Sequence, residues 1–149
     1  MMNESGEVWD TDQAFANRPM LVYFGYTYCP DVCPTTLLDM VVASEATAVD
    51  EALVFVSVDP ARDSVADLAA YTDLFDPHLH GFTGTPTALE AVKTDWAIFS
   101  ARHDSPEFTD YLLDHTTLTF LTDAQHRVVE VFRDSATAAT IADAINTRF

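Results

Sequence analysis

The sequence predicts an α/β protein whose central mixed sheet is flanked by helices, and three observations lead to this fold class. Residues 20–24 form an apolar run typical of a strand, and residues 53–58 have the β-branched and aromatic content of a strand buried on both faces. Helical patterns follow each run, and a late pair of strands is separated only by a tight turn. With 149 residues, of which 48% are apolar, the chain is long enough to bury the core of one domain.

Three helices are predicted in the first two thirds of the chain from spacing and capping residues. The first follows Pro34, and the second starts near Asp63 and Ser64, which are good helix caps. The third starts at Thr85 and Pro86, an N-cap followed by a first-turn proline. The apolar residues that recur at helical spacing are Leu38, Val41, Val42, Val49, Leu68, Tyr71, Phe75, Leu89, Val92 and Trp96.

The remaining elements complete a thioredoxin-like order. They are an extended piece at 97–101, a loop at 103–108, strands at 116–121 and 127–132, a turn at 123–126 and a helix at 137–147. Parallel strands first and an antiparallel hairpin late match a thioredoxin-like sheet. We expect residues 19–149 to form this domain. Residues 1–18 are expected to be a short N-terminal segment, the remnant of an opening hairpin after a removed anchor.

The charge of the chain disfavours two classes of partner. The chain carries 24 acidic and 7 basic residues, a net charge of −17, whereas nucleic-acid phosphates and anionic membranes attract basic surfaces. We therefore expect no nucleic acid as a partner. No apolar stretch is long enough to span a membrane. No exposed apolar stripe indicates an obligate dimer, so a monomer is expected.

Cys29 and Cys33 are the two cysteines of the chain, and they lie where the first strand gives way to the first helix. Ligands bind at this position in α/β folds. Three intervening residues place the two thiols one helical turn apart, on one face. The positive end of the helix dipole favours thiolate over thiol there. This geometry suits either a disulfide or two thiolate ligands to one metal ion.

Three other interpretations of the cysteine pair are disfavoured: a purely structural disulfide, a zinc site and a peroxidase. A plain stabilising disulfide would close a very short loop and gain little entropy. A closed zinc site needs four protein ligands, whereas this chain has only two cysteines. A peroxidase of the peroxiredoxin type carries a Pro-x-x-x-Thr-x-x-Cys arrangement, and the residues before Cys29 do not supply it.

Four stretches carry a family resemblance, and they occur in the family's order: YFGYTYCPDVCP (23–34), VDPARD (58–63), GFTGT (81–85) and DHT (114–116). They resemble the Sco/SenC family of copper-binding, thioredoxin-fold assembly factors for cytochrome c oxidase. The match runs from about residue 19 to about residue 132, most of the chain. Tyr28 stands where many members have histidine, the amino-terminal segment is shorter than usual, and we expect the membrane anchor common in the family not to be part of this sequence.

His115 is the predicted third ligand. Thioredoxin-like redox proteins usually carry a proline before the corresponding strand, but no proline follows Pro106 here and His115 occupies that neighbourhood. The family resemblance implies that this histidine completes a copper site with Cys29 and Cys33. Two thiolates and one imidazole suit Cu(I), whereas Cu(II) would need water or a carboxylate in addition. Asp114 and Asp59 are the carboxylate candidates.

The other polar residues that stand out have structural interpretations. Asp59 and Arg62 are expected to brace the loop after the second strand, and Asp31 to complement the helix dipole. No ligand role is predicted for the remaining histidines, which are assigned to polar loops or a turn: His78, His80, His103 and His126.

The resemblance implies a copper chaperone that binds one Cu(I) or Cu(II) ion per chain and delivers it to the binuclear copper centre of cytochrome c oxidase subunit II. Such a protein transfers an ion by ligand exchange and is not an enzyme. The alternative is a thiol–disulfide oxidoreductase that reduces the cysteines of the oxidase subunit, or a redox sensor. Another copper chaperone or a thioredoxin-like reductant is a further candidate partner. The implied location is the periplasm or the outer face of the inner membrane.

Overall fold

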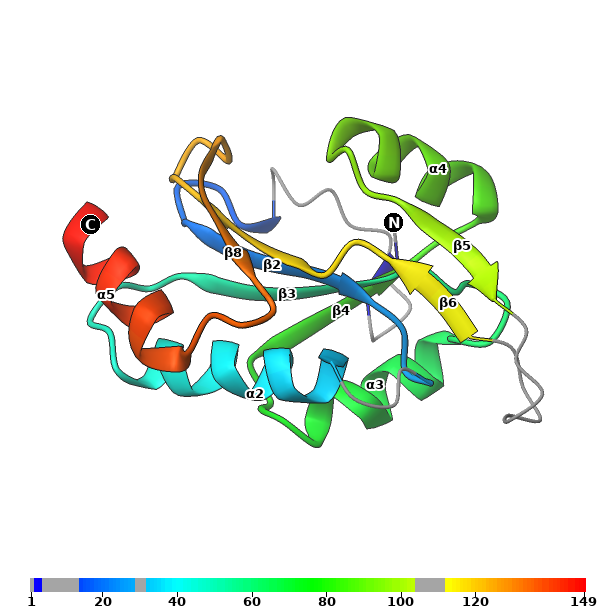
Figure 1. Ribbon diagram of the computed structural model, residues 1–149, viewed down its shortest axis with the longest axis horizontal. Helices are drawn as coiled ribbons and strands as arrows, with labels where there is room; N and C mark the ends of the chain where they lie inside the picture. Colours follow the sequence, from blue (N-terminus) through cyan, green and yellow to red (C-terminus); the bar gives the residue numbers. More distant parts are fainter. Residues whose placement is uncertain (1, 4–13, 29–31, 104–111) are drawn as a thin grey trace.

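A computed structural model of the chain describes residues 2–3, 14–28, 32–103 and 112–149 (Figure 1). Side chains are described for residues 14–28, 34–100 and 116–149. The elements, in order, are β1 (Met2–Asn3), β2 (Met20–Gly25), α2 (Val32–Glu45), β3 (Ala52–Ser57), α3 (Val65–Asp73), β4 (Leu79–Thr83), α4 (Pro86–Asp95), β5 (Ser100–His103), β6 (Leu112–His115), β7 (Leu118–Thr122), β8 (Val128–Arg133) and α5 (Ala138–Arg148).

The main sheet has the strand order β1-β4-β3-β2-β7-β8, and β5 and β6 form a separate two-stranded sheet. β2, β3 and β4 are parallel, whereas β7 runs antiparallel to β2 and β8 antiparallel to β7. Tyr23 on the central strand β2 pairs with Phe55 on one side and with Thr119 on the other. The predicted mixed sheet flanked by helices is therefore confirmed.

Successive residues of β2 enter different cores because side chains alternate across a strand. Leu21 and Tyr23 belong to the cluster that α2, α3 and α5 cover, and Met20, Val22 and Phe24 belong to the cluster beneath α4. The helices α2 and α3 accordingly lie on one side of the sheet, and α4 lies on the other (Figure 1). Helices therefore pack against both faces of the sheet, and β2 is buried along its whole length.

The predicted helix starts at Ser64 and Thr85 are confirmed. The hydroxyl of Ser64 accepts a hydrogen bond from the backbone N–H of Asp67 at 3.1 Å, and Thr85 does the same for Ala88 at 3.1 Å. Each hydroxyl satisfies a backbone donor that the first helical turn leaves without an intrahelical partner. Of the residues expected on their inner faces, Leu68 and Leu89 are buried, and Tyr71, Phe75, Val92 and Trp96 pack against the core clusters.

The first helix differs from the prediction in its start and in its buried face. It begins at Val32, so Pro34 lies in the first turn, where proline is tolerated because no intrahelical N–H bond is lost there. Val41 is buried as its spacing indicates, but Leu38 and Val42 are 54% and 45% exposed. Val49 lies beyond the end of the helix and packs against the core.

Strand β4 was not predicted, and this corrects the assignment of His80 to a solvent-facing polar loop. β4 pairs with β3, and the ring of His80 is half-buried with its centroid 5.2 Å from that of Phe15. His78 is exposed, as expected.

The small sheet corrects two further expectations. His103 belongs to strand β5 rather than to a loop, whereas residues 104–108 of the predicted loop lie outside the described residues. His115 is the last residue of β6, a strand that was not predicted, and the core strand predicted at 116–121 starts at Leu118. Among the described residues, no helix is long and apolar enough to cross a membrane.

Candidate functional site

The three predicted ligand residues differ in how far the structure describes them. Cys29 lies outside the described residues. The backbone of Cys33 forms the second position of α2, and the backbone of His115 ends β6, but the side chains of both lie outside the described set. Their placement is therefore argued from the backbone.

The topology brings the end of β6 and the loop after β2 to the same end of the main sheet (Figure 1). Because β7 runs antiparallel to β2, it begins beside the carboxyl end of β2, where Thr119 pairs with Tyr23. Only residues 116–117 separate His115 from β7. Backbone bonding fixes this connection, since Thr116 donates its N–H to the carbonyl oxygen of Phe99 at 2.9 Å.

The loop that leads from β2 towards Cys29 is anchored by the loop after β3. Val58 donates its backbone N–H to the carbonyl oxygen of Gly25 at 2.7 Å, which extends the pairing of β2 and β3 beyond the last strand residues. Tyr26 is buried at 2% exposure. Thr27 then donates both its backbone N–H and its hydroxyl to the carboxylate of Asp63, at 3.1 and 2.5 Å.

Arg62 and Asp59 brace the same region, as predicted. The Nε of Arg62 donates to a carboxylate oxygen of Asp59 at 2.5 Å, and Asp59 is almost fully buried. The guanidinium carbon of Arg62 also lies 4.4 Å from the ring centroid of Tyr28 and 5.7 Å from that of Tyr26. A guanidinium over an aromatic face is attracted by the ring electrons. Tyr28, the residue before Cys29, is thus held against the loop after β3 while half of its surface stays exposed.

Asp63 is the residue whose role the sequence interpretation missed. It was assigned to the cap of the second helix, but Ser64 is the cap and the carboxylate of Asp63 turns towards Thr27 and Ser57. Burial raises the pKa of the Asp63 carboxyl group, hydrogen bonds from Ser57 and Thr27 oppose that rise, and the negative charge of Asp59 adds to it. The sequence feature that could have revealed this role is the position of Asp63 just beyond a buried parallel strand, because ligand sites in α/β folds lie at the carboxyl ends of such strands.

The histidines outside the predicted site have other partners. His78 places Nδ1 2.9 Å from a carboxylate oxygen of Asp76 on the surface. His126 lies in the β7–β8 turn with a positive φ of 62°, and its Nε2 lies 2.9 Å from the carbonyl oxygen of Phe15. Because a carbonyl oxygen only accepts, this nitrogen carries the proton. Among the described residues, no three His, Cys, Asp or Glu residues are placed to hold a metal ion.

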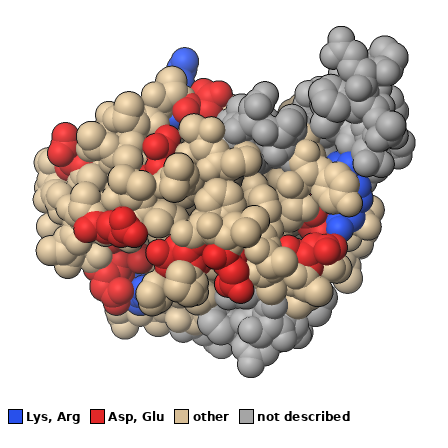
Figure 2. All heavy atoms as spheres, turned by 90° about the horizontal axis from the view of Figure 1, so that it is seen from below, with Lys and Arg blue, Asp and Glu red and all other residues tan. Residues whose placement is uncertain are grey.

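The position of Cys33 determines what the site can do chemically. A cysteine in the first helical turn lies at the positive end of the helix dipole, which favours the thiolate that both metal binding and disulfide exchange require. Acidic side chains are spread over the face covered by α2 and α3, with few basic ones beside them (Figure 2). A cationic partner is therefore compatible with this face of the molecule.

Comparison with known proteins gives one consistent family. The SCO1/SenC family profile matches residues 1–149. The Protein SenC of Rhodobacter capsulatus is 39% identical over 139 residues, which cover 91% of this chain and 62% of SenC. The human mitochondrial Protein SCO1 homolog is 32% identical over 142 residues, 92% of this chain and 47% of that protein. The chain thus spans less than two thirds of these relatives.

Solved structures agree with this result. The copper-bound ScoI of Arabidopsis thaliana superimposes with a TM-score of 0.92 at 27% identity, covering 98% of this chain and 92% of that one. The copper-bound ScoI of Bradyrhizobium japonicum gives a TM-score of 0.85 at 34% identity, covering 99% and 94%. The predicted thioredoxin-like fold is confirmed by these likenesses.

Proposed function

The chain belongs to the SCO1/SenC family, and from this membership we propose that it is a copper chaperone that holds one copper ion through Cys29, Cys33 and His115. The recipient in this proposal is the binuclear copper centre of cytochrome c oxidase subunit II. The exchange takes place in the periplasm or at the outer face of the inner membrane. Copper as the metal is supported by the copper-bound structures of its relatives.

One observation carries the proposal: the backbone of Cys33 and the end of the strand that carries His115 lie at the same end of the sheet. Two thiolates and one imidazole form a soft, three-coordinate donor set, which Cu(I) accepts and which is too small for a closed zinc site. Copper is the cargo, so each bond to the chaperone must be replaceable. Thiolates of the recipient would displace those of Cys29 and Cys33 one at a time.

An anaerobic copper titration of the reduced protein tests the ligand set. We expect one copper per chain, loss of tight binding in Cys29→Ser and Cys33→Ser, and binding weakened by orders of magnitude in His115→Ala. His78→Ala is the matched control, because His78 is an exposed histidine paired with Asp76. Transfer is then measured by mixing copper-loaded protein with the apo copper domain of subunit II. Tight one-to-one binding by His115→Ala would refute the ligand assignment.

The alternative function uses the same two cysteines without the histidine. A thiolate of the pair would attack a partner disulfide to give a mixed disulfide. The second thiolate would then release the partner as a dithiol and leave the Cys29–Cys33 disulfide, a two-electron exchange. Position at the start of α2 favours the thiolate for this step too. Stoichiometric reduction of a partner disulfide by a protein that binds no copper would favour this alternative.

A further inference from the structure

A single buried carboxyl group links three segments next to the proposed copper site. Asp63 is 1% exposed and accepts three hydrogen bonds. Two come from Thr27, in the loop after β2, and the third comes from the hydroxyl of Ser57, the last residue of β3, at 2.6 Å. The carboxyl group thereby ties the loop before Cys29 to the end of the neighbouring strand.

Asp63 is itself held rigidly. Its backbone N–H donates to the carbonyl oxygen of Asp59 at 2.9 Å, and Ser64, the next residue, caps α3. The hydroxyl of Ser57 accepts from the backbone N–H of Asp59 at 3.1 Å while it donates to Asp63. The carboxyl group is therefore fixed from its own backbone and from β3, and Thr27 is the group it restrains.

The restraint acts close to the first cysteine. Thr27 precedes Cys29 by two residues, and the side chain of the intervening Tyr28 lies against Arg62. Burying a carboxyl group is unfavourable unless hydrogen bonds satisfy it, so removing either partner leaves the other uncompensated. Burial raises the pKa of Asp63, in agreement with its desolvated position.

We propose that Asp63 is a positioning residue for the Cys29–Cys33 pair, because its carboxylate holds the backbone and hydroxyl of Thr27. It touches neither copper nor a reacting sulfur. It narrows the positions open to Cys29, so that less conformational freedom is lost when that thiolate joins Cys33 on a metal ion or in a disulfide. The expected effect on copper binding rests on the proposed function, whereas the expected effect on the Cys29–Cys33 disulfide does not.

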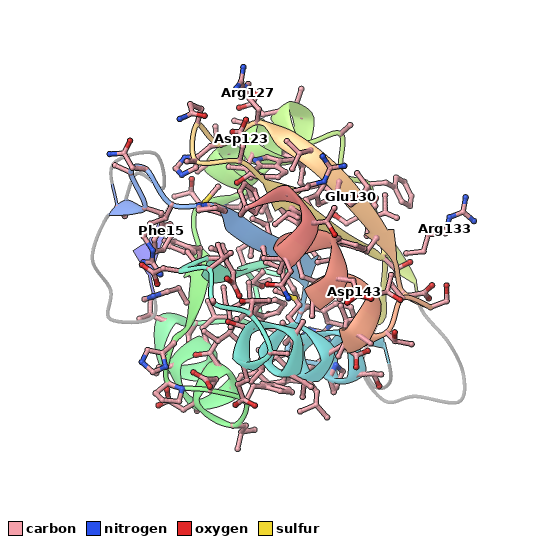
Figure 3. All side chains as sticks on the ribbon, turned by 90° about the vertical axis from the view of Figure 1, so that its left-hand side faces the viewer. Phe15, Asp123, Arg127, Glu130, Arg133 and Asp143 are labelled. Carbon is pink, nitrogen blue, oxygen red and sulfur yellow. The ribbon has the colours of Figure 1, made fainter. Side chains whose placement is uncertain are left out.

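Two variants and one control test the role of Asp63. Asp63→Asn keeps the shape but replaces one accepting oxygen by an NH2 group, and Thr27→Val removes only the hydroxyl donor. The control is Asp123→Asn. Asp123 accepts backbone N–H bonds from Gln125 and Arg127 at 2.9 Å in the β7–β8 turn, close to the ion-paired Arg127 (Figure 3).

Asp123 follows β7, which ends beside the start of β2, where Met20 donates its backbone N–H to the hydroxyl of Thr122. The loop that leads to Cys29 follows the opposite end of β2, so the control lies far from the proposed site. Asp123→Asn makes the same change of side chain and also weakens hydrogen bonds, so it shows how far a loss of stability away from the site changes copper binding. A positioning role affects only the variants of Asp63 and Thr27.

The readouts are Cu(I) affinity, by competition with a chromophoric chelator, and the equilibrium of the cysteine pair with glutathione. We expect Asp63→Asn to weaken Cu(I) binding by about 10-fold, the lower end of the range seen when hydrogen-bond partners of metal ligands are removed, because Asp63 acts through Thr27 and not on a ligand directly. The same variant should shift the pair towards the dithiol. Thr27→Val should change both in the same direction by a smaller factor, and Asp123→Asn should change neither.

Each outcome decides a different point. Wild-type affinity and equilibrium in folded Asp63→Asn and Thr27→Val would overturn the positioning role, and Thr27→Val decides alone if Asp63→Asn does not fold. Equal losses in Asp123→Asn would also overturn it. If the wild-type protein binds no copper, the proposed function fails, whereas the glutathione equilibrium still tests Asp63.

Discussion

Asp63 and Asp123 both accept hydrogen bonds from loops, yet their surroundings shift their pKa values in opposite directions. At Asp63 burial is the largest influence and raises the pKa. At Asp123 the backbone N–H of Arg127 is the largest influence, the side chain of Arg127 and the backbone N–H of Gln125 add to it, and the pKa falls. The first carboxyl group is enclosed between the loop after β2 and the end of β3, and the second, whose side chain is 17% exposed, lies in a turn at the surface. Sequence alone does not separate them, because the difference comes from tertiary enclosure.

The lowered pKa of Asp123 predicts a pH-dependent contribution to stability. Because the folded-state pKa lies below the ordinary value of 3.8, the ionised carboxylate stabilises the fold above pH 3.8, and this contribution disappears as the pH falls through the lower folded pKa. Asp123→Asn should therefore lower the urea midpoint at neutral pH, and the difference from wild type should shrink below pH 3.8. Urea denaturation followed by circular dichroism measures this. A difference that stays constant through acid pH would contradict it.

The matched control for this prediction is Asp134→Asn, in the exposed turn after β8. It removes one negative charge from a chain of net charge −17, as Asp123→Asn does. Any effect of the charge alone should thus appear in both variants. The pH-dependent loss should appear only in Asp123→Asn.

At the scale of elements, the helices and strands that could be predicted are those with a local sequence signal. Strands that form only because they pair with a neighbour could not be predicted. The buried runs of β2 and β3 and the caps Ser64 and Thr85 carry their own signals. β4 does not, because His80 and Gly81 interrupt its apolar residues, and it is a strand through its pairing with β3. The buried face of α2 was ambiguous, because apolar residues lie on both of its faces.

The candidate site likewise has a part that could be predicted from the sequence and a part that could not. The place of Cys33 at the start of the first helix could be predicted, since a motif and a strand signal define it, whereas Cys29 lies outside the described residues. The hold of Asp63 on Thr27 could not, because it joins residues 36 positions apart and depends on the depth at which the two loops pack. His115 was predicted to lie just before a core strand, and its backbone does precede β7, but as the last residue of β6, a strand too short to give a clear signal in the sequence.

The missed strand β4 supplies a prediction about packing. A Cβ atom on Gly81 would lie 3.1 Å from Cγ2 of Thr72 in α3, and hydrogen bonds from the Thr72 hydroxyl to the carbonyls of Leu68 and Ala69 keep that methyl group in place. Gly81→Ala should therefore destabilise the fold by about 1–3 kcal/mol, the usual effect of overpacking a core. Chemical denaturation measures the change in the free energy of unfolding.

A second substitution separates this clash from a general intolerance of alanine in β4. Thr72→Ser removes the methyl group and keeps the hydroxyl, so Gly81→Ala should be less destabilising in the Thr72→Ser background than in the wild type. Equal losses in the two backgrounds would show that contact with Thr72 is not the cause. Such a double-mutant cycle isolates the pairwise contribution.

At the scale of the whole molecule, charge opposes compactness. The chain has 24 acidic against 7 basic residues, and among the described residues the ion pairs of Arg18, Arg62, Lys93, Arg127 and Arg148 engage only a few of the carboxylates. The remaining negative charges repel one another in the folded state more than in the expanded unfolded chain. Salt should relieve this repulsion, because it shortens the range over which exposed charges interact.

Raising NaCl from about 0.1 M to about 1 M shortens the Debye length from about 10 Å to about 3 Å, and we expect the urea midpoint at pH 7 to rise over this range. Choline chloride at equal ionic strength is the control, because screening depends on ionic strength and not on the cation. A rise with NaCl alone would indicate specific sodium binding instead. A fall with both salts would mean that attractive ion pairs outweigh the net repulsion, so the net charge of −17 would not be the main electrostatic influence on stability.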